Sequence, residues 1–532
     1  MHSNRYPAGG VSPLHANRVT RLADQERDTP IHQRPWAHRF GLGASICLIL
    51  SGCAVGPDFK TPALPQGAAS GYSAHGLTSA TTAAGPDAAR SGIAQHLTYS
   101  QDLSAQWWEL FHSEPLNQLI NRALQHNTTL AAAQASLRQA RANLDSTSDS
   151  QDYPTFTGQL GATRERAVLT GSTPSDYTLY NSSVNVSYTL DLFGGERRQQ
   201  EALRAAVDYQ RYEVEAAYQT LVSNVVTTAI QQASLRAQLQ ATQALLEAQQ
   251  RQLAVIEKQL ALGAVAQPAV LAQGMLVAQT RAQLPALDKQ LSQTQHQMAV
   301  YVGAFPGESG LPEFQLEDLQ LPTQLPVSLP SALVRQRPDI RASEALLHQA
   351  SAQVGVATAN LYPQITLSGS YGSDLLQLGG LSVNNTLWNL GAGLTQPLFD
   401  AGALRAKRSA STAAYDQAEA QYRETVLKAF QNVADALHAI DADASTLKYQ
   451  AEDVAQARRS LEVSTRQYAL GGISYLSLLD AERSYQQARV SLASAQAARL
   501  SDSAALFLAL GGGWWNRPAT HTQPVDSLAG GG

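Results

Sequence analysis

Two patterns of hydrophobic and polar positions alternate along this 532-residue chain. The first is a heptad, in which apolar residues recur every seven positions over two long stretches, roughly 196–262 and 403–470. Such a sustained heptad predicts helices that wind around neighbouring helices, each about 100 Å long at ~1.5 Å per residue. The repeated positions are Tyr218, Val225, Gln232, Leu239, Leu246, Leu253 and Leu260 in the first stretch, and Val426, Val433, Ile440, Leu447, Val454, Leu461 and Tyr468 in the second.

Both heptad stretches end at glycine, and the pattern then resumes. Gly263 ends the first stretch, and Gly471 with Gly472 ends the second. Glycine is favoured where a helix must stop, so each half is predicted to be a long helical hairpin bent at glycine. The returning helices carry Val270, Val277, Leu284, Leu291 and Met298 in the first half, and Leu478, Tyr485, Leu492, Arg499 and Leu506 in the second.

The second pattern is a strict alternation of apolar and small polar residues ahead of each long helix. Four such segments begin near Phe156, Val184, Ile365 and Trp388, with threonine, serine, asparagine and glycine at the intervening positions. Segments of about ten residues with one apolar face are typical of membrane-barrel strands. One such segment is a weak signal, but four at matching places are a strong one.

The second half of the chain repeats the first. Gln259–Val265 reads against Gln467–Ile473, and Tyr153–Pro154 against Tyr362–Pro363. Leu192–Gly195 answers Leu398–Gly402, where Gly194, Gly195 and Gly402 are expected to turn strand into helix. We therefore predict a first structural repeat over 105–305, a Pro-rich linker over 306–330 and a second repeat over 331–515.

The predicted strands require several copies of the chain. Four strands cannot close a barrel, and an open sheet edge leaves backbone groups unpaired in lipid. Two copies would give eight strands, whose interior side chains nearly fill, whereas three leave room for an aqueous lumen. The expected fold is thus an α+β membrane protein: a duplicated strand–strand–helical hairpin unit, with four strands per chain in a trimeric 12-stranded β-barrel continued by a coiled-coil helical tube in the periplasm. No run of eighteen apolar residues is present, so no transmembrane helix is expected.

The N-terminus has the layout of an export signal. Residues 1–39 carry six arginines against three acids, and a short apolar segment then leads to Leu50-Ser51-Gly52-Cys53. This tetrapeptide looks like a lipobox, which predicts a signal peptide over 1–52, acylation of Cys53 and a lipidated linker over 53–104. The alternative is a plain signal peptide with an incidental cysteine. Cys47 and Cys53 are the only cysteines, so a disulfide framework is excluded.

Composition argues against two other classes of protein. Only 15% of residues are charged and the net charge is −5, whereas a nucleic-acid-binding protein would show a clustered basic excess. No metal-ligand spacing, P-loop or catalytic constellation is present, so we expect neither a cofactor, a metal nor an enzyme. The Trp107-Trp108 pair could anchor at a membrane interface, but core packing is the favoured interpretation. Residues 516–532 are expected to be a disordered tail.

Several motifs together resemble one family. They are Cys53–Phe59, Trp107–Phe111, Arg337–Ile340, Gln396–Gly402 and Ala509–Trp514, in matching order. The chain is similar to the NodT/OprM group of outer-membrane efflux lipoproteins, relatives of TolC. The resemblance implies an outer-membrane homotrimer, held also by lipid at Cys53, that docks with a periplasmic adaptor and an inner-membrane transporter of the resistance-nodulation-division (RND) class. Ala54 after the cysteine likewise implies sorting to the outer membrane.

The bend of the second half carries the candidate gate. Leu476 and Asp480 are four residues apart, so they stack on one helix face just past Gly472. The resemblance implies that Tyr468, Leu476, Asp480 and Arg483 form the closing constriction and its polar links. On the residues alone, the favoured interpretation of Asp480 is a solvated residue paired with Arg483, and Tyr468 could equally be the last position of its heptad.

The expected function is a passive exit duct of an RND-type efflux system, gated at its periplasmic tip. Two alternatives stay open: the same duct in type I protein secretion or metal export, and a non-conducting coiled-coil scaffold of the envelope. The four alternating segments argue against the scaffold, which has no use for them.

Overall fold

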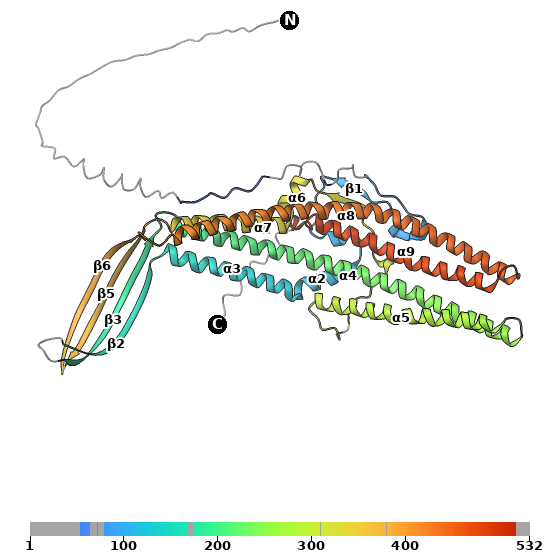
Figure 1. Ribbon diagram of the computed structural model, residues 1–532, viewed down its shortest axis with the longest axis horizontal. Coiled ribbons are helices and arrows are strands. Elements are labelled where there is room, and N and C mark those ends of the chain that lie inside the picture. Colours follow the sequence, from blue (N-terminus) through green and yellow to red (C-terminus); the bar gives the residue numbers. More distant parts are fainter. Residues whose placement is uncertain are drawn as a thin grey trace, which may run out of the picture. The chain divides into compact units, whose positions relative to one another are not determined.

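Two helices of 67 residues each dominate the fold, because the two long heptads of the sequence run without interruption. The computed structural model describes residues 54–63, 72, 79–168, 174–308, 310–378 and 380–517. Helix α4 (Gly195–Ala261) and helix α8 (Ala403–Ala469) each lead from a pair of strands to a bend (Figure 1). Cys53, the predicted signal peptide and residues 518–532 lie outside the described residues.

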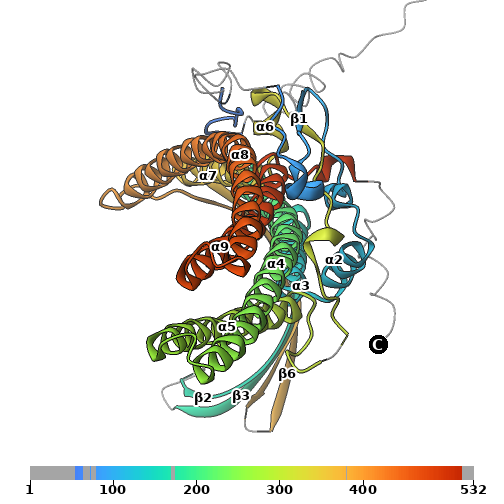
Figure 2. The ribbon, with the colours of Figure 1, turned by 90° about the vertical axis from the view of Figure 1, so that its right-hand side faces the viewer.

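Shorter helices complete each repeat. Helix α5 (Gln267–Tyr301) returns along α4 and α9 (Tyr475–Ala509) returns along α8. Ahead of the strands lie α3 (Thr128–Asp152), which packs on α4, and α7 (Pro338–Ala359), which packs on both α4 and α8. Contacts between α4 and α9 hold the two hairpins side by side (Figure 2).

The four alternating segments form one antiparallel sheet in the order β2-β3-β5-β6. Their bounds are β2 (Thr155–Ala167), β3 (Ser175–Leu190), β5 (Gln364–Leu378) and β6 (Leu381–Thr395). They are 13 to 16 residues long rather than the expected ten or so. The difference arises because backbone pairing continues past the apolar alternation through charged residues such as Arg166, which lies opposite Asp176.

Two segments expected to be linkers contain regular structure. Strand β1 (His96–Tyr99) pairs in parallel with β4 (Gln324–Val327), so the region before the first repeat joins the region between the repeats. The other short elements are α2 (Glu114–His126), α6 (Pro330–Gln336) and four 3-10 turns among the described residues. The turns are η2 (Pro86–Gly92), η3 (Trp107–Phe111), η4 (Leu316–Asp318) and η5 (Trp514–Asn516).

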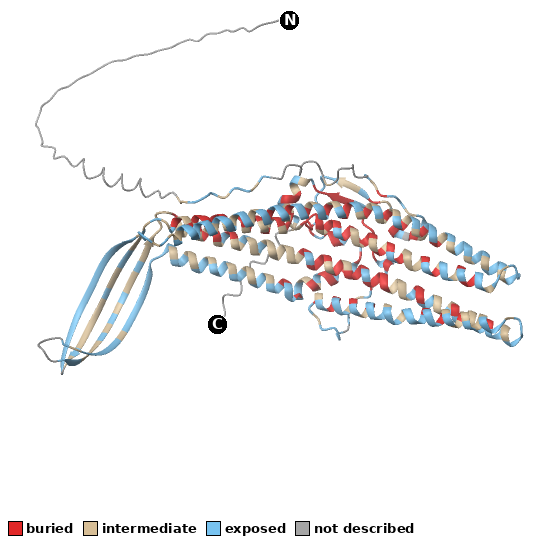
Figure 3. Cartoon of the chain, viewed as in Figure 1, coloured by how far each residue is buried: buried red, intermediate tan, exposed pale blue. Residues whose placement is uncertain are grey.

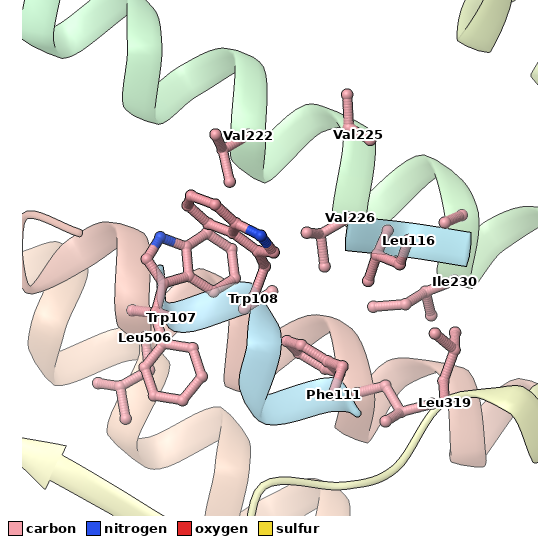
Figure 4. Packing of buried hydrophobic residues seen from close by; sticks show 14 of the residues in the cluster. Trp107, Trp108, Phe111, Leu116, Val222, Val225, Val226, Ile230, Leu319 and Leu506 are labelled. Carbon is pink, nitrogen blue, oxygen red and sulfur yellow. The ribbon is translucent and has the colours of Figure 1, made fainter. Parts of the chain in front are cut away.

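The main hydrophobic core lies where these short elements cover the long helices. Trp107 and Trp108 are 0% and 2% exposed, which confirms the core-packing interpretation of this pair. The ring of Trp107 contacts the rings of Trp108, Phe111 and Phe507, and valines of α4 lie on the other side of the tryptophan pair (Figure 4). Burial concentrates in this middle region and is sparse on the sheet (Figure 3).

The heptad seam is confirmed in α8 and shifts in α4. Val433, Ile440 and Leu447 are buried as expected. In the half of α4 nearer the bend, however, Leu239, Leu246 and Leu253 are half-buried, and the buried positions are Thr242, Gln249 and Ile256. Each buried residue lies three positions after the predicted leucine, and a heptad has its second apolar position three residues after its first.

Arg499, at a predicted seam position of α9, is fully buried and faces an N-terminal strap, defined here as residues 79–99. Its guanidinium donates to the carbonyl oxygens of Ser91 (2.8 Å) and Ile93 (2.8 Å), and to Thr81 Oγ1 (2.9 Å) and Gln95 Oε1 (3.3 Å). Burial lowers the pKa of Arg499 to about 10, so the group stays charged at neutral pH. The strap is therefore fastened to α9 by one buried cation.

Candidate functional site

The bends of the two hairpins share one backbone geometry. Gly263 and Gly471 both have φ of 74°, a left-handed conformation that favours glycine. Each is followed by a residue whose N–H donates 2.8 Å back to the helix: Ala264 to the carbonyl of Gln259, and Gly472 to that of Gln467. These bonds satisfy carbonyls that the helix end would leave unpaired.

The returning helices begin with different chemistry. Helix α9 starts after Ser474, whose Oγ accepts from the N–H of Ser477 (3.3 Å). Helix α5 instead has Pro268 in its first turn, at the position that corresponds to Leu476. Ala272 corresponds to Asp480. Only the second bend therefore carries a carboxylate at this place.

The structure brings two of the four candidate gate residues together. Asp480 and Arg483 lie one helical turn apart with 3.7 Å between carboxylate and guanidinium, and their side chains are 63% and 67% exposed. Leu476 is 62% exposed one turn before Asp480. All three side chains therefore reach solvent from α9.

Tyr468 lies apart from this group and links the two hairpins. Its hydroxyl donates to Gln259 Oε1 of α4 (3.4 Å), and its ring lies 5.5 Å from the ring of Tyr475. Burial raises the pKa of Tyr475 above its usual range. Tyr468 thus holds the tip of α8 against the tip of α4.

Two residues of this tip contact were not singled out from the sequence. Tyr475 replaces Gln267 of the first repeat, and this difference between aligned repeats was the available signal. Glu482 is largely buried, which raises its pKa, while the charge of Arg251 on α4 opposes that rise. A carboxylate of α9 therefore faces an arginine of α4 at the same end.

The strand-to-helix turns are built alike at the other end of the long helices. Gly194 and Gly402 have φ of 77° and 87° and immediately precede α4 and α8. An aspartate caps each helix: Asp191 accepts from two N–H groups of α4, and Asp400 accepts from the N–H groups of Gly402 and Leu404. Hydrogen bonds from these N–H groups hold the pKa of Asp400 below its usual value.

Gly194 is also the place where the N-terminal segment reaches the turn. A Cβ on Gly194 would lie 2.5 Å from the Cα of Ala54, so only glycine fits. Gly195 faces α7, and a Cβ built there lies 3.1 Å from the Cβ of Ala359. The residue after Cys53 therefore lies against the strand-to-helix turn, although Cys53 itself is outside the described residues.

A cavity of about 530 Å³ lies where α9 ends and α7 begins, with α4 and α8 beside it. Arg337 joins the two helices: it donates to the carbonyl of Ala509 (2.8 Å) and makes two bonds to Asp339 (2.7 and 3.0 Å). Asp502 also lines this cavity. Among the described residues no cluster of three or more metal-ligating side chains occurs, and no described helix has the length and hydropathy needed to cross a membrane.

Comparison with known proteins gives a consistent result. The family model described as "Outer membrane efflux protein" matches residues 119–304 and 329–512. The chain is 33% identical to the pyoverdine export outer membrane protein OpmQ of Pseudomonas aeruginosa, over 77% of this chain and 87% of OpmQ. It is 29% identical to the cation efflux system protein CusC of Escherichia coli, over 88% of this chain and 98% of CusC.

A solved structure agrees with this result. The outer-membrane channel OprN superposes with a TM-score of 0.75 at 28% identity, over 87% of this chain and all of OprN. The two segments matched by the family model each run from before a strand pair to the end of a returning helix. The resemblance seen in the sequence motifs is thereby confirmed.

Proposed function

This chain belongs to the outer membrane efflux protein family and is an outer-membrane protein, and from that premise we propose that it is the exit duct of a tripartite efflux system. In this proposal three copies join their sheets into a twelve-stranded barrel and their helices into a periplasmic tube. A periplasmic adaptor and an inner-membrane RND transporter supply the cargo and the energy. The duct itself conducts passively and catalyses no reaction.

One observation carries the proposal: a four-stranded sheet with two free edges continues directly into helices about 100 Å long. The free edges β2 and β6 require partners in lipid, because unpaired backbone groups there cost several kcal/mol each. Three copies satisfy both edges of every sheet and leave a water-filled lumen. Acylation of Cys53 would add a lipid anchor beside the strand-to-helix turn.

The cargo proposed is a small molecule. OpmQ, at 33% identity, is named for export of pyoverdine, whereas CusC, at 29%, is named for cation efflux. In this kind of system the inner-membrane transporter selects what enters the duct. A metal exporter would therefore use the same duct with a different pump.

The second bend is proposed as the gate. Three copies of Leu476 and Asp480 would form an apolar ring and a carboxylate ring, with Arg483 bound to Asp480. Tyr468 would hold the closed position through Gln259. The first bend, with Pro268 and Ala272 at these places, cannot form a charged ring.

Single-channel recording in planar bilayers tests both parts. The wild-type trimer is expected to give small or flickering currents, and Asp480→Ala large and steady ones, because loss of the carboxylate ring releases the constriction. Glu424→Gln is the matched control, since Glu424 forms an equally exposed helix pair with Lys428 far from the tip. The control should conduct like the wild type.

Two outcomes would contradict the proposal separately. No current from either protein, in a preparation that runs as a heat-modifiable trimer, would reject the duct in favour of a scaffold. Equal currents from wild type and Asp480→Ala, with passive permeability of cells also equal, would reject the gate while leaving the duct in place.

A further inference from the structure

The two repeats meet inside the chain through a short aromatic contact. The ring of Phe193, in the turn from β3 to α4, stacks on that of Tyr362, between α7 and β5, at 4.7 Å and 17°. Leu192, Phe193 and Pro363 line one cavity of about 210 Å³. The motif Leu-Phe after a strand therefore docks on the motif Tyr-Pro before the next strand.

Because the chain is duplicated, each motif occurs a second time. Leu398 and Phe399 repeat Leu192 and Phe193, and Tyr153 with Pro154 repeats Tyr362 with Pro363. The second copies have no such contact: Leu398 is 94% exposed, Phe399 90% and Tyr153 68%. Large apolar side chains this exposed, in neighbouring positions, mark a surface that another molecule covers.

The elements that carry these motifs are open in the same way. Helix α7 lies between α4 and α8 and is buried along most of its length, whereas its counterpart α3 has α4 as its main partner and buries only Leu130 among its residues. Strand β3 pairs with β5, whereas their counterparts β6 and β2 are the two edges of the sheet. The turn motifs, the helix and the strands that are covered at the boundary between the repeats thus each have a less covered counterpart at an outer edge of the chain.

We propose that Leu398 and Phe399 of one copy dock on Tyr153 and Pro154 of the next copy, with Phe399 stacked on Tyr153. The same contact places α8 against α3, and β6 antiparallel to β2, across copies. This deepens the proposed function, since it rests on a trimer and names the residues by which its copies meet.

We infer that a second copy of this chain covers the exposed motifs, because the chain carries both halves of the contact, one on each outer edge. A contact between two different patches of identical subunits propagates from copy to copy and ends only when a ring closes. The stacking of Phe193 on Tyr362 within the chain is the geometry expected for the same contact between copies. The turn before α8 is two residues longer than the turn before α4, so Asp400 and Ala401 are the places where the two contacts differ.

Crosslinking between two differently tagged chains tests the contact directly. One chain carries Phe399→Cys and the other Tyr153→Cys, they are co-expressed, and a short bismaleimide that spans the missing rings is added to the purified trimer. We expect a covalent dimer that contains both tags.

Each variant alone is the control for the native Cys47 and Cys53 and should give no dimer. No mixed dimer from an intact trimer would overturn the docking and leave the proposed duct standing, whereas absence of a trimer in the wild type would overturn both.

Alanine variants then separate assembly from folding. We expect the association constant of the trimer to fall by about tenfold per contact in Phe399→Ala and in Tyr153→Ala. Because both substitutions remove the same contact, the double variant should lose no more than the stronger single variant. Unfolding of the dissociated protomer should be unchanged in all three. Tyr362→Ala is the matched control, because it breaks the equivalent contact within the chain and should lower the melting temperature of the protomer. Additive losses in the double variant would show that the two rings do not meet.

Discussion

At the residue scale, Asp502 of α9 has an environment that ties stability to pH. It lines the cavity at the start of α7 and lies against Asp443 of α8. Burial, a hydrogen bond that protonated Asp502 donates to Asp443, and the negative charge of that second carboxyl raise the pKa of Asp502 to about 7. Asp435, Asp339 and Arg337 line the same cavity, and Arg499 lies one turn away on α9.

The raised pKa fixes the direction of the effect. Between about pH 4 and pH 7 the folded protein holds a proton on Asp502 that the unfolded chain releases, so stability falls as the pH rises through this window. Asp502→Asn removes the titrating group. We expect the variant to melt higher than the wild type at pH 8 and to lose the decline between pH 5 and pH 8, as measured by circular dichroism.

The exposed Asp416 of α8 provides the control for this prediction. Asp416→Asn removes the same charge from a solvated position and should leave the pH dependence unchanged. If Asp502→Asn shifted the melting temperature equally at pH 5 and pH 8, protonation of Asp502 would be the wrong explanation of the pH dependence.

The candidate gate shows what single residues disclose without a structure. The offset between Leu476 and Asp480 follows from helix periodicity, and the pair between Asp480 and Arg483 follows from their spacing; the structure contains this pair at 3.7 Å. The partner of Tyr468 did not follow, because Gln259 belongs to the other hairpin, and nothing local specifies how hairpins lie side by side. The role of these residues in closure stays a prediction.

At the scale of elements, the helices and bends could be predicted because their causes are local. A heptad and a left-handed glycine are properties of neighbouring residues, and α4, α8 and both bends lie where the pattern places them. The pairing of β1 with β4 could not be predicted, since it joins residues far apart in the chain through backbone groups alone. The same holds for the strap beside α9, whose fastening residue, Arg499, stands in the sequence as one more seam position.

The strap provides a prediction at this scale. Arg499→Met keeps the approximate length of the side chain but takes away the guanidinium that donates to the carbonyls of Ser91 and Ile93 and to Gln95 Oε1. Buried acceptors left unpaired cost about 1–3 kcal/mol each, so we expect the strap to detach. Limited trypsin digestion should then cleave faster at Arg90, an exposed residue of the strap that lies in η2 while the strap is attached.

The variant Arg499→Lys distinguishes the effect of the positive charge at this position from the effect of the number of hydrogen bonds that the side chain donates. Lysine keeps the positive charge but cannot make the forked set of contacts of a guanidinium, so cleavage at Arg90 should be intermediate between wild type and Arg499→Met. Cleavage of Arg499→Met no faster than wild type would show that the strap is held by its other contacts, such as those of η2 with α8.

At the scale of the whole molecule, the two bends lie at the opposite end of the long helices from the sheet (Figure 1), which is the end that the proposed adaptor would contact. Each bend exposes one leucine beside its glycine: Leu262 is 84% exposed and Leu470 is 87% exposed. The two bends differ in charge but share this apolar residue and its backbone geometry. A partner that contacts both hairpins in the same way would therefore bind the leucines rather than Asp480.

The double variant Leu262→Ser with Leu470→Ser tests this interface. Burial of one leucine contributes about 1.5–3 kcal/mol, so loss of both should weaken binding of the purified periplasmic adaptor at least tenfold, as measured by biolayer interferometry. Trimer stability and single-channel current should not change, because neither leucine contributes to the core or to the proposed gate. Leu427→Ser is the matched control, since Leu427 is 63% exposed on α8 away from the bend. Adaptor binding that survives the double variant and falls in the control would place the docking surface along the side of the helices and not at their tips.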